Sequence, residues 1–451
     1  MIYDLCIIGG GINGAGIARD AAGRGLSVLL LEKGDLAEAT SSKSSKMIHG
    51  GLRYLEFFEF GLVRKSLAER ETLLRIAPQI VSPLRLCIPH RNAVRPAALV
   101  RMGLFLYDHL TRMNRLPTSE TVSLKTHPFG APLKDRSGVG FAYSDCWVDD
   151  ARLVVLNAMD AAAHGADIRV RCAAKSVVPV NGHWRIHTDQ GDFESRTIVN
   201  AAGPYAASFL QDQNLVRPTT PALRLVQGSH IVIPKLYEGD HAYLIQCPDR
   251  RVVFVFPYEG EFTLVGTTET AYHGDPKDAH ITEGEMAYLC DVVTREFAKP
   301  VTAQDVIWSY SGVRPLFDDK QESDARTVTR DYKLVMDDHQ GAKILTVFGG
   351  KLTTYRPLAE DVMECLRPVF SDMGADMGPA WTAEAVMPLI DFKFQPDEKT
   401  IRHFIRNEWA QDVTDVLWRR TKWGLHMNAA DQADLKTMFD RVWAAEKGGQ
   451  P

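Results

Sequence analysis

The sequence is poor in cysteine, and its cysteines form no pairs. The seven cysteines lie far apart, include no Cys-x-x-Cys motif and are odd in number. This spacing argues against a disulfide framework and against a structural zinc site. We therefore expect a chain that works in a reducing cytoplasm and holds no metal.

Long apolar runs and a strong charge imbalance are missing as well. No run of about 18 apolar residues occurs, and the first residues lack the basic stretch and cleavage site of a signal peptide. We therefore expect neither secretion nor a membrane span, so that any membrane contact is made from the surface. The formal net charge of −5 argues against a chain that binds nucleic acid over its whole surface.

What remains is an ordinary globular composition. With 451 residues, 45% hydrophobic and 24% charged, the chain is long enough for about two or three domains. Residues 2–8 form a short apolar run, followed by GGGINGAG, a helical stretch through Arg24 and a second apolar run, LSVLLLE. This order predicts a βαβ unit with buried parallel strands at the start of the chain.

Two later regions differ in pattern. Asn181-Gly182 separates two strand-like runs as a hairpin turn. Successive antiparallel strands are expected at 225–233, 242–246, 251–256 and 262–266. Together these segments predict a second, sheet-rich domain. From Asp397 onward, apolar residues recur at helical spacing, which predicts a small C-terminal helical domain.

The glycine-rich segment carries a nucleotide-binding fingerprint. Gly9, Gly11 and Gly14 have the GxGxxG spacing. In this motif the first glycine makes a tight turn, the second admits a pyrophosphate and the third packs the helix on the strand. The phosphates would lie at the helix N-terminus. Glu32 ends the second strand, where an acidic side chain accepts hydrogen bonds from the adenosine ribose.

The fingerprint suits both FAD and NAD, and two other segments favour FAD. Residues 195–206 (SRTIVNAAGPYA) look like the strand and small-residue turn that return to the dinucleotide in glutathione-reductase-like enzymes, with Ala202 and Gly203 at the turn. In residues 347–355 (VFGGKLTTY), two glycines open a helical run. The N-terminus of such a helix would stabilise the negative charge of a reduced flavin.

Several further motifs carry a family resemblance. Residues 40–56 (TSSKSSKMIHGGLRYLE) are rich in hydroxyls and glycine, and they resemble the flavin-proximal loop of the FAD-dependent (aerobic, quinone-linked) glycerol-3-phosphate dehydrogenases. The same family is matched by GLFLYDHL, FAYSDCWVDDARL, QGSHIVIP, VGTTE, WSYSGVRPL, FGGKLTTYRPLAE and LWRRTK. These motifs cover essentially the whole chain in the expected order.

The resemblance implies an α/β fold with a glutathione-reductase-like, doubly wound FAD-binding domain, an inserted antiparallel-sheet substrate domain and a small C-terminal helical domain. The implied ranges are 1–80, 141–222 and 325–370 for the FAD-binding domain, 81–140 and 223–324 for the substrate-binding, membrane-facing domain, and 371–451 for the cap. The cap is shorter than the family leads us to expect, with a deletion near 389–397.

Carried onto this sequence, the resemblance implies a cofactor site and a substrate site. Arg53, Tyr54, Arg314 and Lys351 are expected to line the substrate pocket, with Thr268 and His230 nearby. A phosphate with nearly two negative charges needs several cations. The residues expected at FAD are Gly9, Gly11, Ile12, Asn13, Gly14, Glu32, Lys33, Thr40, Ser41, Ser42, Ser45, His49, Gly50, Gly51, Val177, Ala202, Gly203, Gly350, Lys351, Leu352 and Thr353.

The implied reaction is the oxidation of sn-glycerol 3-phosphate to dihydroxyacetone phosphate, with hydride transfer from C2 to flavin N5. A base must take the hydroxyl proton. His49 is the first candidate because it lies in the flavin-proximal loop and imidazole titrates near neutral pH. His230 is the second. Either histidine could instead be a hydrogen-bonding pocket or core residue.

Residues 97–113 predict an amphipathic helix that could lie on anionic lipid, although a helix packed on the core has the same periodicity. The resemblance implies attachment to the cytoplasmic face of the inner membrane and electron delivery to membrane quinone. A homodimer is left open. Arg101, Asp108 and Arg112 share one face of this helix, Leu99, Met102, Leu106, Leu110 and Met113 lie broadly opposite, and Arg91, Arg95 and Arg115 flank it.

Three other functions stay open. A soluble glycerol-3-phosphate oxidase would use oxygen and release peroxide. A flavin amino-acid oxidase would share the scaffold but bind a carboxylate with fewer cations. A non-enzymatic FAD protein could act as a redox sensor, although the pocket cations and His49 argue against that.

Overall fold

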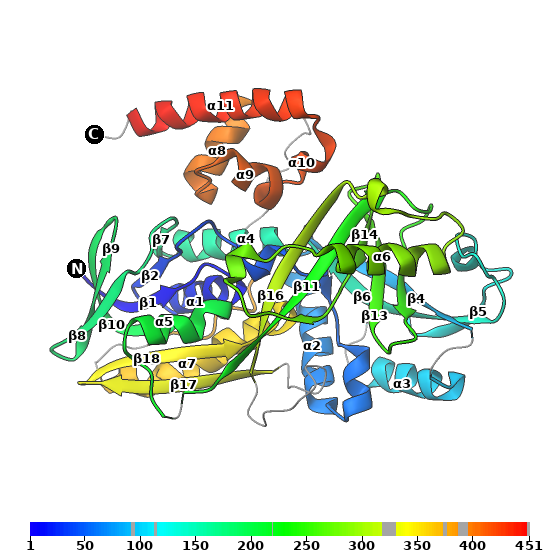
Figure 1. Ribbon diagram of the computed structural model, residues 1–451. Helices are drawn as coiled ribbons and strands as arrows, with labels where there is room; N and C mark the ends of the chain where they lie inside the picture. Colours follow the sequence, from blue (N-terminus) through cyan, green and yellow to red (C-terminus); the bar gives the residue numbers. More distant parts are fainter. Residues whose placement is uncertain are drawn as a thin grey trace.

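The structure, a computed structural model, describes residues 1–91, 95–111, 115–218, 220–317, 331–372, 377–386 and 396–448. Two sheets form the body, and a small helical cap lies over them (Figure 1). None of the helices within these ranges is long and apolar enough to cross a membrane.

The first sheet contains the predicted βαβ unit. Its strands lie in the order β17-β18-β10-β1-β2-β7, and the neighbours from β18 to β7 pair in parallel. This order confirms the expected doubly wound α/β architecture. The strands are β1 (Ile2–Ile8), β2 (Val28–Leu31), β7 (Asp167–Arg169), β10 (Gly191–Asn200), β17 (Tyr332–His339) and β18 (Ala342–Gly349).

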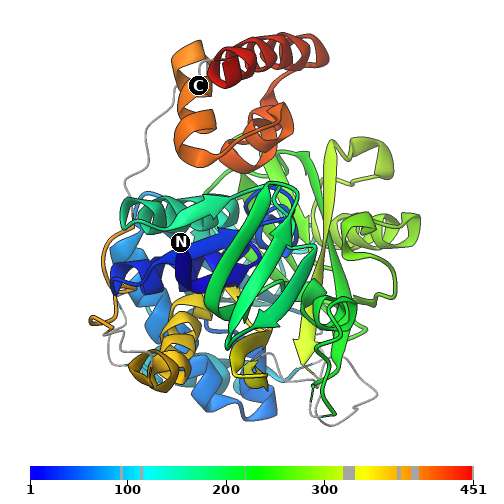
Figure 2. The same cartoon turned by 90° about the vertical axis from the view of Figure 1, so that its left-hand side faces the viewer.

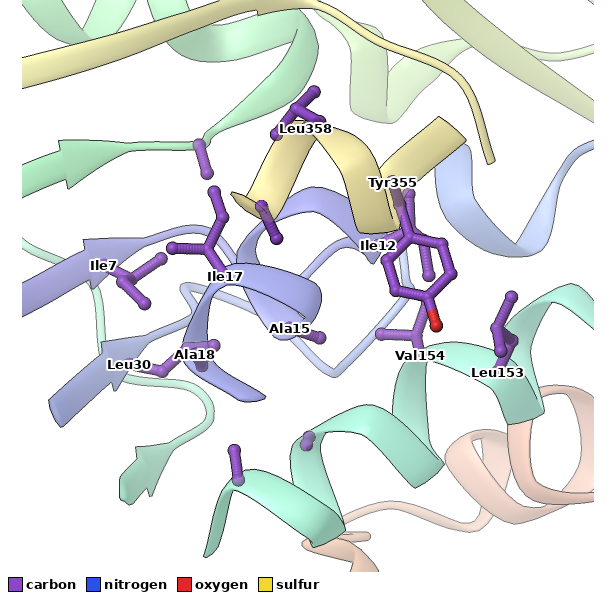
Figure 3. Close-up of a cluster of buried hydrophobic side chains, with 14 of the residues drawn as sticks. Ile7, Ile12, Ala15, Ile17, Ala18, Leu30, Leu153, Val154, Tyr355 and Leu358 are labelled. Carbon is purple, nitrogen blue, oxygen red and sulfur yellow. The ribbon is translucent and has the colours of Figure 1, made fainter. Parts of the chain in front are cut away.

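Both faces of this sheet are buried. Leu5 and Ile7 face a core that the sheet shares with α1 (Ile12–Gly23), α4 (Asp150–Ala163) and α7 (Tyr355–Asp372). Cys6 and Ile8 belong to a second core, on the side of α5 (Ala206–Asp212). Figure 3 shows α1 enclosed by α4 and α7 in the first of these cores. Because side chains alternate along a strand, burial on both sides explains the unbroken apolar runs of the sequence.

The predicted hairpin is formed by β8 (Ser176–Val180) and β9 (His183–Thr188). Its turn residues, Asn181 and Gly182, both have positive φ, 51° and 80°, as a two-residue type I′ turn requires. Because β9 pairs with β10, the hairpin extends the first sheet and is not part of the second domain.

The second sheet contains the four predicted strands, and the pairs β11–β14, β14–β13 and β13–β12 are antiparallel. β12 pairs in parallel with β4, so the sheet is mixed at that point. The strands are β3 (Met47–Ile48), β4 (Val81–His90), β5 (Glu120–Ser123), β6 (Val139–Val148), β11 (Leu223–Pro234), β12 (Ala242–Gln246), β13 (Val252–Tyr258), β14 (Phe262–Gly266), β15 (Thr270–Ala271) and β16 (Trp308–Phe317).

One strand crosses an implied domain boundary. The motif FAYSDCWVDDARL begins in β6 and continues into α4, and β6 pairs with β4 in the second sheet. The first part of the range 141–222 therefore lies with the second sheet, because the motif runs from one sheet to the other. The domain ranges themselves stay a prediction.

Three helices cover the second sheet. α2 (Phe60–Ile76) and α3 (Ala97–His109) pack on one side, through Leu67 and Leu104. α6 (Glu283–Glu296) packs on the other, through Leu289. The predicted helix 97–113 is thus observed as α3, while Arg112 and Met113 lie outside the described residues.

The cap has a core of its own, in which Ile401 and Phe404 pack with Leu435 and Phe439. It agrees with the predicted C-terminal helical domain, although most of the expected deletion near 389–397 falls outside the described residues. Figure 2 shows the cap raised above the body. It consists of α8 (Glu398–Glu408), α9 (Val413–Asp415), a π-helical turn (Val416–Arg420), α10 (Trp423–His426) and α11 (Ala429–Gly448).

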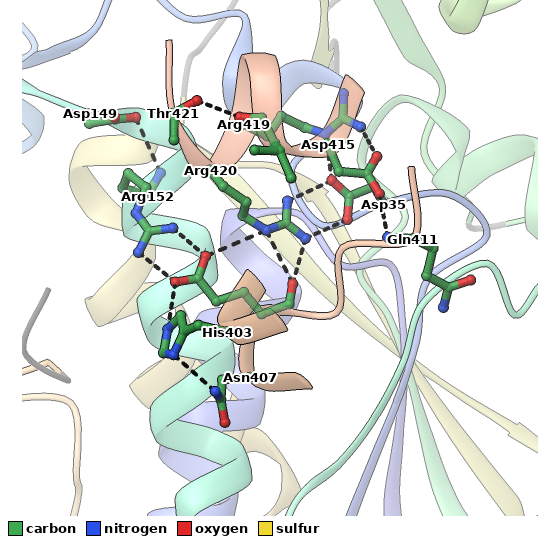
Figure 4. A network of polar contacts seen from close by, with 12 residues as sticks. Asp35, Asp149, Arg152, His403, Asn407, Gln411, Asp415, Arg419, Arg420 and Thr421 are labelled. Atoms are coloured by element: carbon green, nitrogen blue, oxygen red, sulfur yellow. Dashed lines mark hydrogen bonds and ion pairs between the residues drawn. The ribbon is translucent and has the colours of Figure 1, made fainter. Parts of the chain in front are cut away.

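Buried ion pairs join the cap to the first sheet and its helices. Arg420 of the cap places Nη2 2.7 Å from Oδ1 of Asp35, which follows β2. Arg152 of α4 donates from Nη2 to Oε1 of Glu408 in α8 at 3.0 Å. Figure 4 shows these side chains as one connected network. The cap is therefore held by buried charges of opposite sign.

Candidate active site

The two sheets enclose a cavity of about 620 Å³. Its walls include the carboxyl ends of β1, β2, β10 and β18, the loop that follows β2, and residues of β13 and β16 from the second sheet. The carboxyl ends of parallel strands are where open α/β sheets bind ligands. The second sheet closes this edge and makes it a cavity.

The fingerprint glycines leave no room for side chains. Gly9 has a φ of 112°, and a Cβ there would lie 2.7 Å from the carbonyl oxygen of Ala201. A Cβ at Gly14 would lie 1.8 Å from the carbonyl oxygen of Gly9. Gly9 and Gly11 line the cavity, whereas Gly14 does not and packs against the turn behind it. Backbone can therefore approach a ligand closely at this turn.

Polar groups beside this turn fit an ADP-bearing flavin. Glu32 lines the cavity, and its carboxylate accepts hydrogen bonds from the N–H groups of Gly10 (2.6 Å) and Gly34 (2.7 Å). Burial raises the pKa of Glu32. Asn13 donates from Nδ2 to the carbonyl of Gly349 (3.2 Å), while its buried Oδ1 has no hydrogen-bond partner within the described part of the chain. A buried acceptor without a partner at a cavity wall suits a ligand with hydroxyl or N–H donors, such as FAD.

Most of the residues predicted to bind FAD surround this one cavity. Five do not line it. Gly14, Gly50 and Gly51 lie behind the wall, Ser42 faces a neighbouring smaller cavity, and the backbone N–H of Val177 donates to Gln213, which does line it. The lining residues are Gly9, Gly11, Ile12, Asn13, Glu32, Lys33, Thr40, Ser41, Ser45, His49, Ala202, Gly203, Gly350, Lys351, Leu352 and Thr353.

The predicted substrate residues divide into two groups. His49, Tyr54, Arg314 and Lys351 line the cavity. Nζ of Lys351 lies 4.1 Å from the centre of the Tyr54 ring, over its face. Arg314 comes from β16 of the second sheet and Lys351 from the loop after β18 of the first. Two cations from different sheets therefore line the same cavity. Arg53 is half-buried and does not line the cavity.

His230 lies behind the wall. It is fully buried, its Nε2 lies 2.9 Å from Oγ of Ser45, and its ring stacks on Tyr310 at 4.8 Å. Burial, together with the charges of Arg314 and Lys46, holds the pKa of His230 well below its usual value. The imidazole is therefore neutral near pH 7, and it reaches the cavity through the Ser45 hydroxyl.

Thr268 also lies behind the wall, and its neighbour takes its place. Thr268 is buried and donates its hydroxyl to Glu285 at 2.6 Å. Thr267 lines the cavity and accepts a hydrogen bond from Arg314 at 3.3 Å. Thr267 was not among the residues expected at the site, although it stands in the same VGTTE motif. Phe254 was not expected there either, because an aromatic residue in a strand carries no local sign of facing a cavity rather than a core.

Comparisons with known proteins agree with the motifs. The family model described as FAD dependent oxidoreductase matches residues 4–356. The glycerol-3-phosphate dehydrogenase of Pseudomonas aeruginosa is 45% identical, over 96% of this chain and 94% of that protein. The D-erythritol 1-phosphate dehydrogenase of Brucella abortus is 44% identical, over 97% of this chain and 98% of that protein. The aerobic glycerol-3-phosphate dehydrogenase of Escherichia coli is 43% identical, over 95% of this chain and 96% of that protein.

Solved structures share the fold. The glycerol-3-phosphate dehydrogenase from Bacillus halodurans complexed with FAD superposes with a TM-score of 0.63 at 25% identity, over 85% of this chain and 67% of that chain. The L-alpha-glycerophosphate oxidase from Mycoplasma pneumoniae with FAD bound gives a TM-score of 0.64 at 17% identity, over 86% of this chain and all of that chain. FAD is thus the cofactor of this protein, and the chain belongs to the FAD-dependent glycerol-3-phosphate dehydrogenase family among the FAD-dependent oxidoreductases.

Proposed function

We propose that the chain oxidises sn-glycerol 3-phosphate to dihydroxyacetone phosphate and passes the electrons to membrane quinone. One observation carries the substrate: Arg314 and Lys351, from different sheets, line the same cavity as the fingerprint residues. A phosphoryl group carries nearly two negative charges and suits such a pair. Relatives from Pseudomonas aeruginosa and Escherichia coli that are named for this substrate support the proposal.

The chain's own residues bind and orient the substrate. The guanidinium of Arg314 offers paired N–H donors to the phosphoryl group, and the ammonium of Lys351 adds a second charge. Tyr54 steadies that ammonium by cation–π attraction, at 4.1 Å. Bound FAD supplies the hydride acceptor, N5 of the ring, for the hydrogen on C2.

His49 is the proposed base for the hydroxyl proton. His49 lines the cavity, and its backbone N–H donates to Oγ1 of Thr353 at 3.4 Å. That bond ties the loop to the segment after β18. His230 stands one hydroxyl away, behind Ser45. We therefore assign proton removal to His49 and a supporting role to His230.

Anaerobic addition of glycerol 3-phosphate to the yellow holoenzyme tests this function. We expect the flavin to bleach, and a quinone to restore its colour faster than oxygen does. Bleaching reversed by oxygen with release of peroxide would favour a soluble oxidase. Bleaching by amino acids alone would favour an amino-acid oxidase, and no bleaching by any candidate would favour a redox sensor.

A longer polyol phosphate is the second candidate substrate. The relative from Brucella abortus is named for D-erythritol 1-phosphate and is as similar to this chain as the glycerol-3-phosphate dehydrogenases are. The cations that would hold the phosphate are the same for both substrates. The ratio of kcat/KM for glycerol 3-phosphate to that for D-erythritol 1-phosphate decides between them.

We also propose that the protein rests on the cytoplasmic face of the inner membrane through α3. The exposed side of this helix carries large apolar residues, with Met102 55% and Phe105 54% exposed. Phe58 in the neighbouring segment is 78% exposed. Large apolar groups gathered on a surface are typical of a contact site.

The flanking charges support this proposal less than the sequence indicates. Arg91 pairs with Glu296 at 2.8 Å, and Arg95 pairs with Glu56. On the helix itself, Arg101 donates a hydrogen bond to the hydroxyl of Ser119, and that hydroxyl donates to Asp108. Paired arginines attract anionic lipid weakly, so we expect apolar insertion to dominate binding.

A further inference from the structure

A buried carboxylate that the proposed mechanism does not use lies across the second sheet from the cavity. Glu285 stands in the first turn of α6, and its Oε1 accepts hydrogen bonds from the hydroxyls of Thr268 (2.6 Å) and Ser229 (3.1 Å). Its Oε2 accepts from the side-chain amide of Gln227 (2.9 Å) and from the backbone N–H of Thr282 (3.0 Å). Both carboxylate oxygens are thus fully engaged.

Capping the helix explains only part of this arrangement. Thr282 and Glu285 form a capping box, which satisfies N–H groups at the helix start. The contacts of Oε1 serve no helix, because Ser229 belongs to β11 and Thr268 to the loop after β14. These hydrogen bonds, with that of Thr282, outweigh burial and hold the pKa of Glu285 below its usual value.

A chain of hydrogen bonds leads from this carboxylate to the cavity. Oγ1 of Thr268 donates to Glu285 and accepts from the N–H of Ser229 at 2.9 Å. Thr267 donates its hydroxyl to the carbonyl of Thr268 at 3.1 Å and accepts from Nη2 of Arg314 at 3.3 Å. Thr267 and Arg314 line the cavity. The side chain and the backbone carbonyl of Thr268 join the two halves of this chain, so the position of Thr268 couples Glu285 to Thr267.

The end of the Arg314 side chain lies close to the backbone of Gly228. A Cβ at Gly228 would lie 2.6 Å from Oγ1 of Thr267 and 2.9 Å from Nη2 of Arg314. The guanidinium and the Thr267 hydroxyl therefore both lie against the strand at this glycine. A displacement of that hydroxyl would disturb the hydrogen bond that Nη2 donates to it.

We propose that Glu285 is a positioning residue, which holds Thr268, and through it Thr267, so that Arg314 is aimed at the phosphoryl group of the substrate. This inference rests on the proposed function, because it takes a phosphate ester as the ligand of Arg314. It adds to that function a carboxylate that touches neither substrate nor cofactor.

Glu285→Gln in the holoenzyme is the central variant. Glutamine can keep the capping box only if its amide oxygen accepts from Thr282, which turns its NH2 group toward Thr268, so the hydrogen bond from Thr268 must reverse or break. Anaerobic titration with glycerol 3-phosphate, followed by flavin absorbance, gives the dissociation constant and the limiting rate of reduction. We expect the dissociation constant to rise about tenfold and the limiting rate to change less than about twofold, the size of effect typical of coupled neighbours.

Three single variants and one double variant separate a role in positioning Arg314 from a general loss of stability. Thr282→Ala removes a capping contact and leaves the contacts of Oε1, so it should lower the melting temperature without weakening substrate binding. Thr268→Val should reproduce the effect of Glu285→Gln, and Thr268→Ser should restore binding. In an Arg314→Lys background, Glu285→Gln should add less than about twofold, because the guanidinium it aims is already gone.

The outcomes are distinct. A wild-type enzyme that glycerol 3-phosphate does not bleach would reject the proposed function itself. A wild type that bleaches, with an unchanged dissociation constant in Glu285→Gln, would reject the positioning role alone. So would a full tenfold effect that persists in the Arg314→Lys background. If Glu285→Gln does not fold, the two Thr268 variants decide by the same criterion.

Discussion

The two histidines considered for proton transfer occupy different surroundings. His49 lines the cavity, whereas His230 is fully buried behind Ser45. A general base must reach the proton that it removes, directly or through one intervening group. We therefore keep His49 as the proposed base, because it lines the cavity itself, whereas His230 reaches the cavity only through the hydroxyl of Ser45.

For His49→Ala we expect bound FAD to be retained and flavin reduction by glycerol 3-phosphate to slow by about 10²- to 10⁴-fold, the usual contribution of a general base. Stopped-flow absorbance in single-turnover experiments measures the rate. Ser45→Ala is the companion variant, because it removes the hydroxyl between His230 and the cavity. Unchanged reduction in His49→Ala would remove His49 from the mechanism.

His230 should make stability depend on pH. Its folded-state pKa lies well below the usual 6.5 because of burial and the nearby Arg314 and Lys46. The unfolded chain binds this proton first as the pH falls, so the free energy of unfolding decreases below about pH 6.5. The loss is at most about 2 kcal/mol by pH 5. Melting temperatures at pH 8, 6.5 and 5 should fall more steeply in wild type than in His230→Gln, and parallel slopes would contradict this.

At the scale of elements, the cap joins the body through charges. Arg420 is fully buried between Asp35 and the backbone carbonyl of Glu408. Its partners hold the guanidinium in place, and Glu408 is held in turn by Arg152, whose charge helps to lower the pKa of Glu408 to about 2. Buried ion pairs of this kind fix the position of the cap relative to the body, because a buried charge without its partner is strongly destabilising.

Arg420→Met should weaken the cap far more than a surface substitution does. Removing one member of a buried pair costs about 3–5 kcal/mol, and here Asp35 and Glu408 would both lose a partner. Hydrogen exchange in α8 and α11 should rise accordingly. Lys436→Met is the control, since its pair with Asp440 is exposed and is worth less than about 1 kcal/mol. Equal exchange in both variants would show that the network does not hold the cap.

At the scale of the whole molecule, helix α3 and the cap lie on opposite sides of the body (Figure 1). A change in the cap would therefore leave the proposed membrane surface intact.

The triple substitution of serine for Phe58, Met102 and Phe105 should weaken binding to liposomes at least about tenfold, because each large apolar side chain contributes up to about 1.5–3 kcal/mol on burial. Flotation with neutral and anionic vesicles measures this. Ile307→Ser is the control, at an apolar residue that is similarly exposed, 49%, but lies outside α3 and the segment of Phe58. Equal flotation of the triple variant and wild type would place the membrane contact elsewhere.

The sequence by itself determined the βαβ unit, the hairpin at Asn181-Gly182, four strands of the second sheet and the helical cap. Most of the residues that it indicated for the site, among them Glu32 and Lys351, line the cavity. These features follow from glycine spacing, turn residues and alternation, which act between neighbours in the chain.

Only the tertiary structure decided which predicted residues reach the cavity and which charges stay available. Thr268 lies behind the cavity wall because its hydroxyl donates a hydrogen bond to Glu285, 17 residues further along the chain. Arg91 and Arg95 are neutralised by Glu296 and Glu56, also distant in sequence. A hydrogen bond or ion pair between residues far apart in the sequence depends on how distant segments pack in three dimensions. Local sequence patterns contain no information about that packing.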